Sequence, residues 1–189
     1  STIGIVQPTT GNVTVAAQGE GKDAVTLDKF EASKLEQTLT ITLNDKAQDT
    51  VTVAAGTDLT GWTTSITGAA ITLAGKANLG DLSGITDSTI SGGTLQLSGD
   101  LDLTKSSLNI TSGVDIADGA TVKVGSGFAA SSVTGGTKNT GVLEIAGGTA
   151  DDPAALTGSI SVQVQVDNGK FVSTKDLANF TGGIEGQEG

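Results

Sequence analysis

Short apolar pairs recur through the middle of the chain, and their spacing constrains the fold more than any other feature. Each pair places two apolar residues at positions i and i+2, which puts both side chains on one face of a strand. The pairs are Ile71/Leu73, Leu95/Leu97, Leu101/Leu103, Leu108/Ile110, Val114/Ile116 and Val122/Val124. From Leu95 onward the first members step by six, seven, six and eight residues, with glycines between the pairs. Glycine suits such corners because it adopts positive φ without strain.

A step of this length is typical of one side of a β-helix, in which a short strand is followed by a turn onto the next side. The alternative is a β-sandwich, for which strands would recur about every 8 to 12 residues. The chain is 36% hydrophobic, 3% aromatic and holds 28 glycines. Its core must therefore be thin and built from Val, Ile, Leu and Ala. We predict an all-β fold with a β-helix as its central part.

The segments on either side of the apolar pairs predict further elements. Alternation from Ile3 to Val15 indicates a strand, a turn and a second strand. Residues 25–39 are the one stretch that could form a short helix, with Asp28 as its cap and Glu31 three positions later. Residues 38–43 and 50–53 alternate around a polar tip and predict a hairpin.

The C-terminal part holds one strong alternating stretch, residues 160–166, which Phe171 and Val172 could join as an antiparallel neighbour. We therefore divide the chain into three parts. Residues 1–65 hold the N-terminal strands, helix and hairpin, residues 66–150 the β-coil, and residues 151–189 a strand and a flexible tail. All three could belong to one domain, because 189 residues suit a single domain of ordinary size.

The residue types that the chain lacks exclude several function classes. The chain has no Cys and no His, so disulfides, thiolate metal sites and the commonest general base are excluded. All ten basic residues are Lys, and the formal net charge is −11. Without the bidentate guanidinium of Arg, an acidic chain is not expected to bind nucleic acid. No run of about 20 apolar residues is present, so we expect no membrane insertion.

Carboxylates are the remaining candidates for chemistry. Asp100 and Asp102 alternate with leucines, which places both acids on the outer face of one strand. They could bind Ca²⁺ or form a glycosidase-like pair, or they could simply keep an exposed strand soluble. Asp115 and Asp118 stand near glycines in the same way. We predict no catalytic residues, no enzyme activity and no cofactor, with Ca²⁺ at these four acids as the one metal left open.

Trp62 is the only tryptophan in the chain. A lone tryptophan could stack on a sugar, but tryptophan more often fills the edge of a core with its N–H bonded outward. We therefore expect Trp62 in the core or in a subunit interface.

The terminal strands are the expected sites of self-association. A strand with an unpaired edge is satisfied when a neighbouring subunit adds a strand to it. We expect the chain to form a trimer or a larger lattice of identical copies. The candidate interface residues are Ile3, Ile5, Val13 and Val15 at the N-terminus and Val162, Val164 and Val166 at the C-terminus.

Residues 87–127, DSTISGGTLQLSGDLDLTKSSLNITSGVDIADGATVKVGSG, resemble two classes of known protein. One class is the Gly/Thr/Asp-rich β-coils of bacteriophage fibres and capsid-decorating proteins, and the other is secreted bacterial adhesins and surface-layer proteins. The resemblance implies a structural protein on the exterior of a virion or a cell surface, bound to a capsid or cell-surface scaffold. A virion fibre or capsid-decoration subunit is the first expectation. The alternative is a secreted bacterial or archaeal filament, surface-layer or matrix subunit, and the third is a glycan-binding module.

Overall fold

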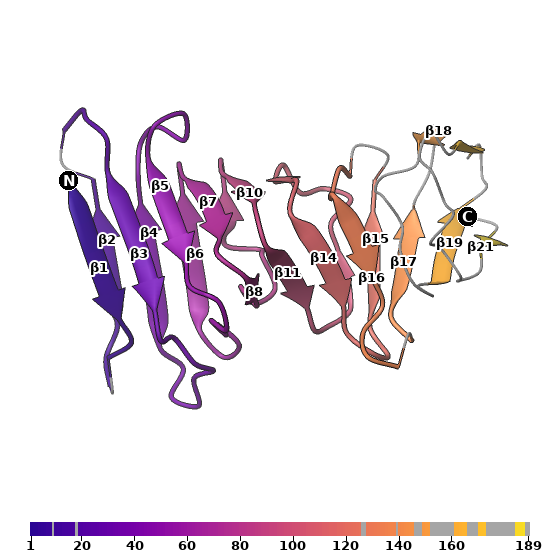
Figure 1. Ribbon diagram of the computed structural model, residues 1–189, viewed down its shortest axis with the longest axis horizontal. Helices are drawn as coiled ribbons and strands as arrows, with labels where there is room; N and C mark the ends of the chain where they lie inside the picture. Colours follow the sequence, from indigo (N-terminus) through magenta and orange to yellow (C-terminus); the bar gives the residue numbers. More distant parts are fainter. Residues whose placement is uncertain are drawn as a thin grey trace. The chain divides into compact units, whose positions relative to one another are not determined.

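The computed structural model is a parallel β-solenoid of about seven turns (Figure 1). The structure describes residues 1–8, 10–17, 19–125, 128–138, 140–145, 149–151, 161–165, 170–172 and 184–187. No helix occurs in these residues. The chain divides into two compact units, which are described in turn.

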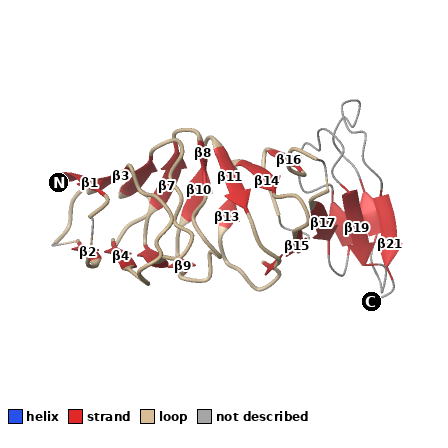
Figure 2. Ribbon diagram, turned by 90° about the horizontal axis from the view of Figure 1, so that it is seen from below, coloured by secondary structure: helices blue, strands red, loops and turns tan. Residues whose placement is uncertain are grey.

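The first unit comprises residues 1–95 and 107–112 and contains two parallel sheets. Sheet A has the order β1 (Thr2–Val6), β3 (Ala24–Asp28), β5 (Thr50–Val53), β7 (Ala70–Leu73), β10 (Thr89–Ser91) and β13 (Asn109–Ile110). Sheet B has the order β2 (Val13–Ala16), β4 (Thr38–Thr42), β6 (Thr63–Thr67) and β9 (Ile85–Thr86). The two sheets run along opposite sides of the unit (Figure 2). On a further side, β8 (Lys76–Ala77) pairs in parallel with the first half of β11 (Thr94–Leu97).

The core of the first unit consists of apolar columns, in which equivalent residues of successive coils stack on one another. In sheet A the column Val25, Val51, Ile71 and Ile90 is in register, and each member is at most 1% exposed. The alternation of apolar residues with Thr, Ser and Ala causes this arrangement, because successive side chains of a strand point to opposite faces. The apolar set faces the interior and the hydroxyl residues face outward.

The second unit comprises residues 96–106 and 113–189. Its largest sheet, sheet C, has the parallel order β12 (Leu101–Asp102), β15 (Thr121–Val124), β17 (Val142–Ile145), β19 (Ser161–Gln165) and β21 (Ile184–Gln187). Two further parallel pairs join β14 (Gly113–Ile116) to β16 (Ser132–Thr134) and β18 (Thr149–Asp151) to β20 (Lys170–Val172).

Sheet C carries a row of charges of alternating sign on its outward face. In the strand register Lys123 lies beside Asp102 on one side and beside Glu144 on the other. Val122 and Val124, the neighbours of Lys123 in sequence, are fully buried. Lys123 must therefore point outward, because its neighbours point inward.

The apolar pairs identified in the sequence lie on successive strands, which confirms the β-helix and not the sandwich. Leu95/Leu97, Val114/Ile116 and Val122/Val124 lie on β11, β14 and β15. Leu101 and Ile110 lie on β12 and β13, each with its pair partner just outside the strand. The step of six to eight residues is therefore the distance from one side of the coil to the next.

The predicted N-terminal helix is wrong. Residues 24–28 form β3, residues 29–37 are irregular, and β4 begins at Thr38. Val25 and Leu27 alternate with outward residues, which is the pattern of a strand, and both are buried. Lys29 and Glu36 have φ of 57° and 52°, in the left-handed region that ends regular structure. Asp28 is consequently the last residue of a strand and caps no helix.

Two expected antiparallel pairings are also wrong. Residues 38–43 and 50–53 do not form a hairpin, because β4 belongs to sheet B and β5 to sheet A. Phe171 and Val172 lie on β20, which pairs in parallel with β18 and not with β19. Short spacing suggests a hairpin whenever a polar tip separates two strands, but in a solenoid the same tip turns the chain onto another side of the coil.

Candidate assembly site at the first coil

The first coil of the solenoid has strands that are paired on one edge. β1 pairs with β3 from Thr2 to Val6, and β2 pairs with β4 from Val13 to Ala16. In the part of the chain that the structure describes, no strand pairs with the other edge of either. The outer edges therefore present backbone N–H and C=O groups that another strand could bond.

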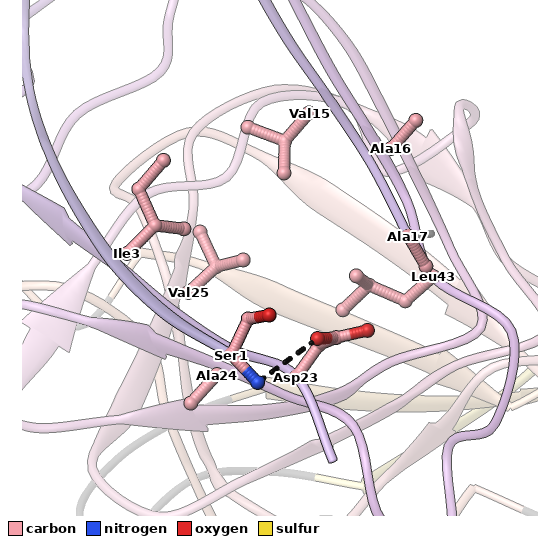
Figure 3. Close-up of a pocket in the computed structure, with 9 residues that line it drawn as sticks. All are labelled: Ser1, Ile3, Val15, Ala16, Ala17, Asp23, Ala24, Val25 and Leu43. Carbon is pink, nitrogen blue, oxygen red and sulfur yellow. Dashed lines mark ion pairs between the residues drawn. The ribbon is translucent and has the colours of Figure 1, made fainter. Parts of the chain in front are cut away.

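A cavity of about 180 Å³ opens beside these strands (Figure 3). Its lining is mainly apolar and comes from the first coil and from the coil next to it. The lining residues are Ser1, Ile3, Val15, Ala16, Ala17, Asp23, Ala24, Val25 and Leu43. One Asp23 carboxylate oxygen lies 3.2 Å from the amino nitrogen of Ser1. The cavity thus combines apolar side chains with one ion pair, between the Ser1 amino group and the Asp23 carboxylate.

The apolar columns of sheet A end uncovered at this coil. Ile3 stands in register with Val25, yet Ile3 is 45% exposed whereas Val25 is 1% exposed. Val6, which stands beside Asp28 on the outward face, is 59% exposed. The other predicted N-terminal interface residues, Ile5, Val13 and Val15, are half-buried. The structure therefore brings all four predicted N-terminal residues together in one coil.

The predicted C-terminal interface residues have different surroundings. Val162 and Val164 lie on β19, which pairs with β17 on one edge and with β21 on the other. The backbone of β19 consequently offers no free edge for an added strand. Val166 lies outside the described residues.

Three of the four candidate calcium ligands, Asp100, Asp115 and Asp118, bind backbone groups of the neighbouring coil. Asp100 Oδ1 accepts a hydrogen bond from the Thr121 N–H at 2.8 Å. Asp115 Oδ1 accepts bonds from the Thr134 hydroxyl at 2.7 Å and from the Gly136 N–H at 3.0 Å. These carboxylates therefore tie one coil to the next.

Asp102 forms a tighter local arrangement within its own turn. Its Oδ1 accepts bonds from the Thr104 hydroxyl at 2.5 Å and from the Thr104 N–H at 3.0 Å. The hydroxyl bond, then the backbone bond, and the nearby charges of Lys123 and Lys105 lower the pKa of Asp102. The carboxylate stays ionised and closes the turn that follows β12.

Asp118 accepts bonds from three residues of the neighbouring coil. Its two oxygens receive the N–H of Lys138, the N–H and hydroxyl of Thr140, and the hydroxyl of Thr137. Partial burial raises the pKa of this carboxyl, but the bonds from Lys138, Thr140 and Thr137 together outweigh burial and lower it. Among the described residues no group of three or more acidic side chains is arranged to hold a metal ion.

Asp49 is a structural carboxylate that the sequence patterns did not single out. Its side chain is fully buried, and it accepts bonds from the N–H groups of Asp23 at 3.0 Å, Asn44 at 3.2 Å and Asp45 at 3.0 Å. The backbone bond from Asp23 makes the largest contribution to lowering its pKa. Asp49 thereby fixes the corner between β4 and β5 and links it to the preceding coil. The only sign of Asp49 in the sequence is its place in a polar tip between two alternating stretches, a pattern that predicts a hairpin turn.

Trp62 lies at the edge of the core, as predicted. It is 7% exposed, and its ring packs against Phe30 with centroids 5.3 Å apart at an interplanar angle of 56°. Its Nε1–H donates to the Glu31 carbonyl at 2.9 Å. The indole therefore holds the irregular segment after β3 against the next coil and presents no open face to a sugar.

The described part of the chain contains no helix long and apolar enough to cross a membrane. No protein-family model, no curated protein and no solved structure matches the chain.

Proposed function

We propose that the chain is a non-enzymatic structural subunit that assembles with copies of itself through the first coil of its solenoid. The observation that carries the proposal is the open first coil, whose two strands each have an edge that no strand of the described residues pairs with, beside an apolar cavity. The resemblance of residues 87–127 favours the exterior of a virion as the setting, as a fibre or capsid-decoration subunit. A cellular surface layer or filament is the alternative, and the same coil would serve it.

The physical reason for assembly at this coil is incomplete burial. Ile3 exposes apolar surface that its equivalent Val25, deeper in the stack, does not, and burying apolar surface yields roughly 25 cal/mol per Å². Within the described residues the first coil has a neighbouring coil on one side only, and a solenoid coil that is uncovered on one side gains from a cap or a partner. A coil from a second copy would supply both the missing strand pairs and the missing apolar layer.

The test is the molar mass of the purified chain at micromolar concentration, measured by light scattering with and without Ca²⁺. We expect an oligomer for the native chain and a shift toward monomer for Ile3→Asp, because the new carboxylate would be buried in the interface. The matched control is Leu35→Asp, since Leu35 is 63% exposed on the irregular segment and receives the same charge change. A native chain that remains monomeric, or equal behaviour of the two variants, would contradict the proposal.

A further inference from the structure

The outward face of sheet B is a regular array of hydroxyl-bearing side chains without a single charge. Its outward positions alternate with the buried residues Leu39, Ile41 and Ile66. Eight of the nine outward residues bear a hydroxyl, and the ninth is Ala16; the eight are Thr14, Thr38, Thr40, Thr42, Thr63, Ser65, Thr67 and Thr86. In a chain of net charge −11, a whole sheet face without a carboxylate is a distinct surface.

These residues form a two-dimensional lattice, because the strands are in parallel register. Thr38 stands beside Thr63, Thr40 beside Ser65, and Thr42 beside Thr67, with Thr86 continuing the third row. Neighbouring strands are about 4.8 Å apart, and alternate residues on one strand are about 7 Å apart. The hydroxyl oxygens of Thr67 and Thr86 are 3.2 Å apart, within hydrogen-bond distance. Threonine is stiff about χ1, so the lattice is ordered before any ligand arrives.

The composition of this face does not suit a protein partner. Cores of protein interfaces are enriched in aromatic residues, Met and Arg, and Ser and Thr are rare among the residues that dominate binding energy. The face of sheet B has none of the favoured types. It also lacks the cationic groups that an acidic polymer would require. Its neutrality and its repeat instead match a ligand that is itself uncharged and periodic.

We propose that the outward face of sheet B binds the surface of ice. Each threonine offers a hydroxyl, which donates one hydrogen bond and accepts two, beside a methyl group. Ordered water bonds such hydroxyls nearly as well as another protein group does, and little entropy is lost when the protein side is already fixed. Many weak contacts made at once by one rigid face give strong overall binding.

Sheet A provides the matched control surface. Its outward row Thr26, Thr52, Thr72 and Ser91 is also rich in hydroxyls. The adjoining row, however, alternates alanine with threonine, and Asp28 stands at the end of β3. Two alanines and a charge thus interrupt the outward face of sheet A, whereas among the outward residues of β2, β4, β6 and β9 Ala16 alone lacks a hydroxyl.

The experiment is partitioning of the intact chain into slowly growing polycrystalline ice, with thermal hysteresis as a second readout. We expect the native chain to enter the ice. The double variant T40K/T67K should be incorporated at least about tenfold less, because the two lysines interrupt the lattice on the adjacent strands β4 and β6. The control T26K/T72K should match the native chain, and so should Ile3→Asp. Circular dichroism checks that each variant keeps its β structure. A milder variant, Thr40→Val, keeps the shape and removes one hydroxyl, and it should weaken incorporation.

Three outcomes would overturn the proposal. The first is exclusion of the native chain from ice, which needs no variant at all. The second is loss of incorporation in T26K/T72K with retention in T40K/T67K. The third is a change in the molar mass of T40K/T67K without any ice binding by the native chain, which would make the face a contact between copies.

Discussion

The carboxylate of Asp118 accepts both the backbone N–H and the hydroxyl of Thr140, a residue 22 positions later on the neighbouring coil, at 3.2 and 3.0 Å. Asp100 bonds Thr121 across one coil in the same way. Asp100, Asp115 and Asp118, three of the four acids that could bind calcium, are thus cross-links between coils. Charge-assisted bonds of this kind are stronger than neutral ones and hold the corners of the solenoid in register.

Asp118→Ala should lower the thermal midpoint of unfolding, because the N–H groups of Lys138 and Thr140 and two hydroxyls lose their acceptor. The measurement is thermal denaturation followed by circular dichroism at neutral pH. Asp81→Ala is the control, since Asp81 bonds Ser83 within its own turn. We expect the control to change the midpoint much less, and equal effects would refute the role of Asp118 between coils.

Stability should fall as the solution is acidified below about pH 4, near the ordinary pKa of Asp. The pKa values of Asp49, Asp102 and Asp118 are lowered in the folded chain. A carboxyl with a lowered folded pKa stabilises the fold above its unfolded pKa, and this stabilisation is lost as the pH falls through the folded value. Thermal midpoints measured from neutral to strongly acidic pH would show the decline. In Asp49→Asn the midpoint should be lower at neutral pH and should depend less steeply on pH.

Ile71→Ala should destabilise the first unit by about 2 to 5 kcal/mol, because Ile71 is fully buried in the middle of an apolar column. Chemical denaturation gives the free energy of unfolding. The control Thr52→Ala changes a half-exposed outward residue of the adjacent strand β5 and should change that free energy by no more than about 0.5 kcal/mol. Similar losses of unfolding free energy in both variants would mean that the apolar columns are not the main source of stability.

Gly61→Ala and Gly56→Ala form a matched pair. Both glycines have left-handed φ, 81° and 83°, so both variants carry a backbone strain of about 1 kcal/mol. A methyl group at Gly61 would also collide with the carbonyl of Ser33, whereas nothing lies within 4 Å of one at Gly56. Gly61→Ala should therefore be the more destabilising of the two in chemical denaturation. Equal losses of unfolding free energy would indicate that the positive φ alone causes the destabilisation and that the contact with Ser33 adds nothing.

The solenoid could be predicted where its coils are short and not where they carry insertions. Between Leu95 and Val122 each side of a coil takes six to eight residues, so the apolar pairs recur visibly. Earlier coils contain long corners such as residues 29–37, and equivalent residues Val25 and Val51 stand 26 positions apart. The repeat is then hidden, and a local pattern such as Asp28 followed by Glu31 resembles a helix start.

The candidate site was predicted in part for a physical reason. Apolar alternation from Ile3 to Val15 is visible in the sequence, because the strands of the first coil keep the same inward pattern as the strands of the coil behind them. The hydrogen bonds of Asp49 could not be predicted from the sequence, because the three donors are backbone N–H groups that only the fold brings together. Pairing of β19 on both edges likewise depends on β21, whose sequence, Ile184–Gln187, has little alternation.

The position of Lys123 between Asp102 and Glu144 disfavours a misfolded solenoid in which a strand pairs with the strand after next instead of with its true neighbour. The inward residues Leu101, Val122 and Leu143 occupy equivalent places, so the core alone would accept the wrong neighbour. If β12 paired with β17 directly, Asp102 would stand beside Glu144, and like charges on adjacent strands repel. Where the inward residues of successive layers are alike, the sign of one outward charge thus favours the correct neighbouring strand over the wrong one.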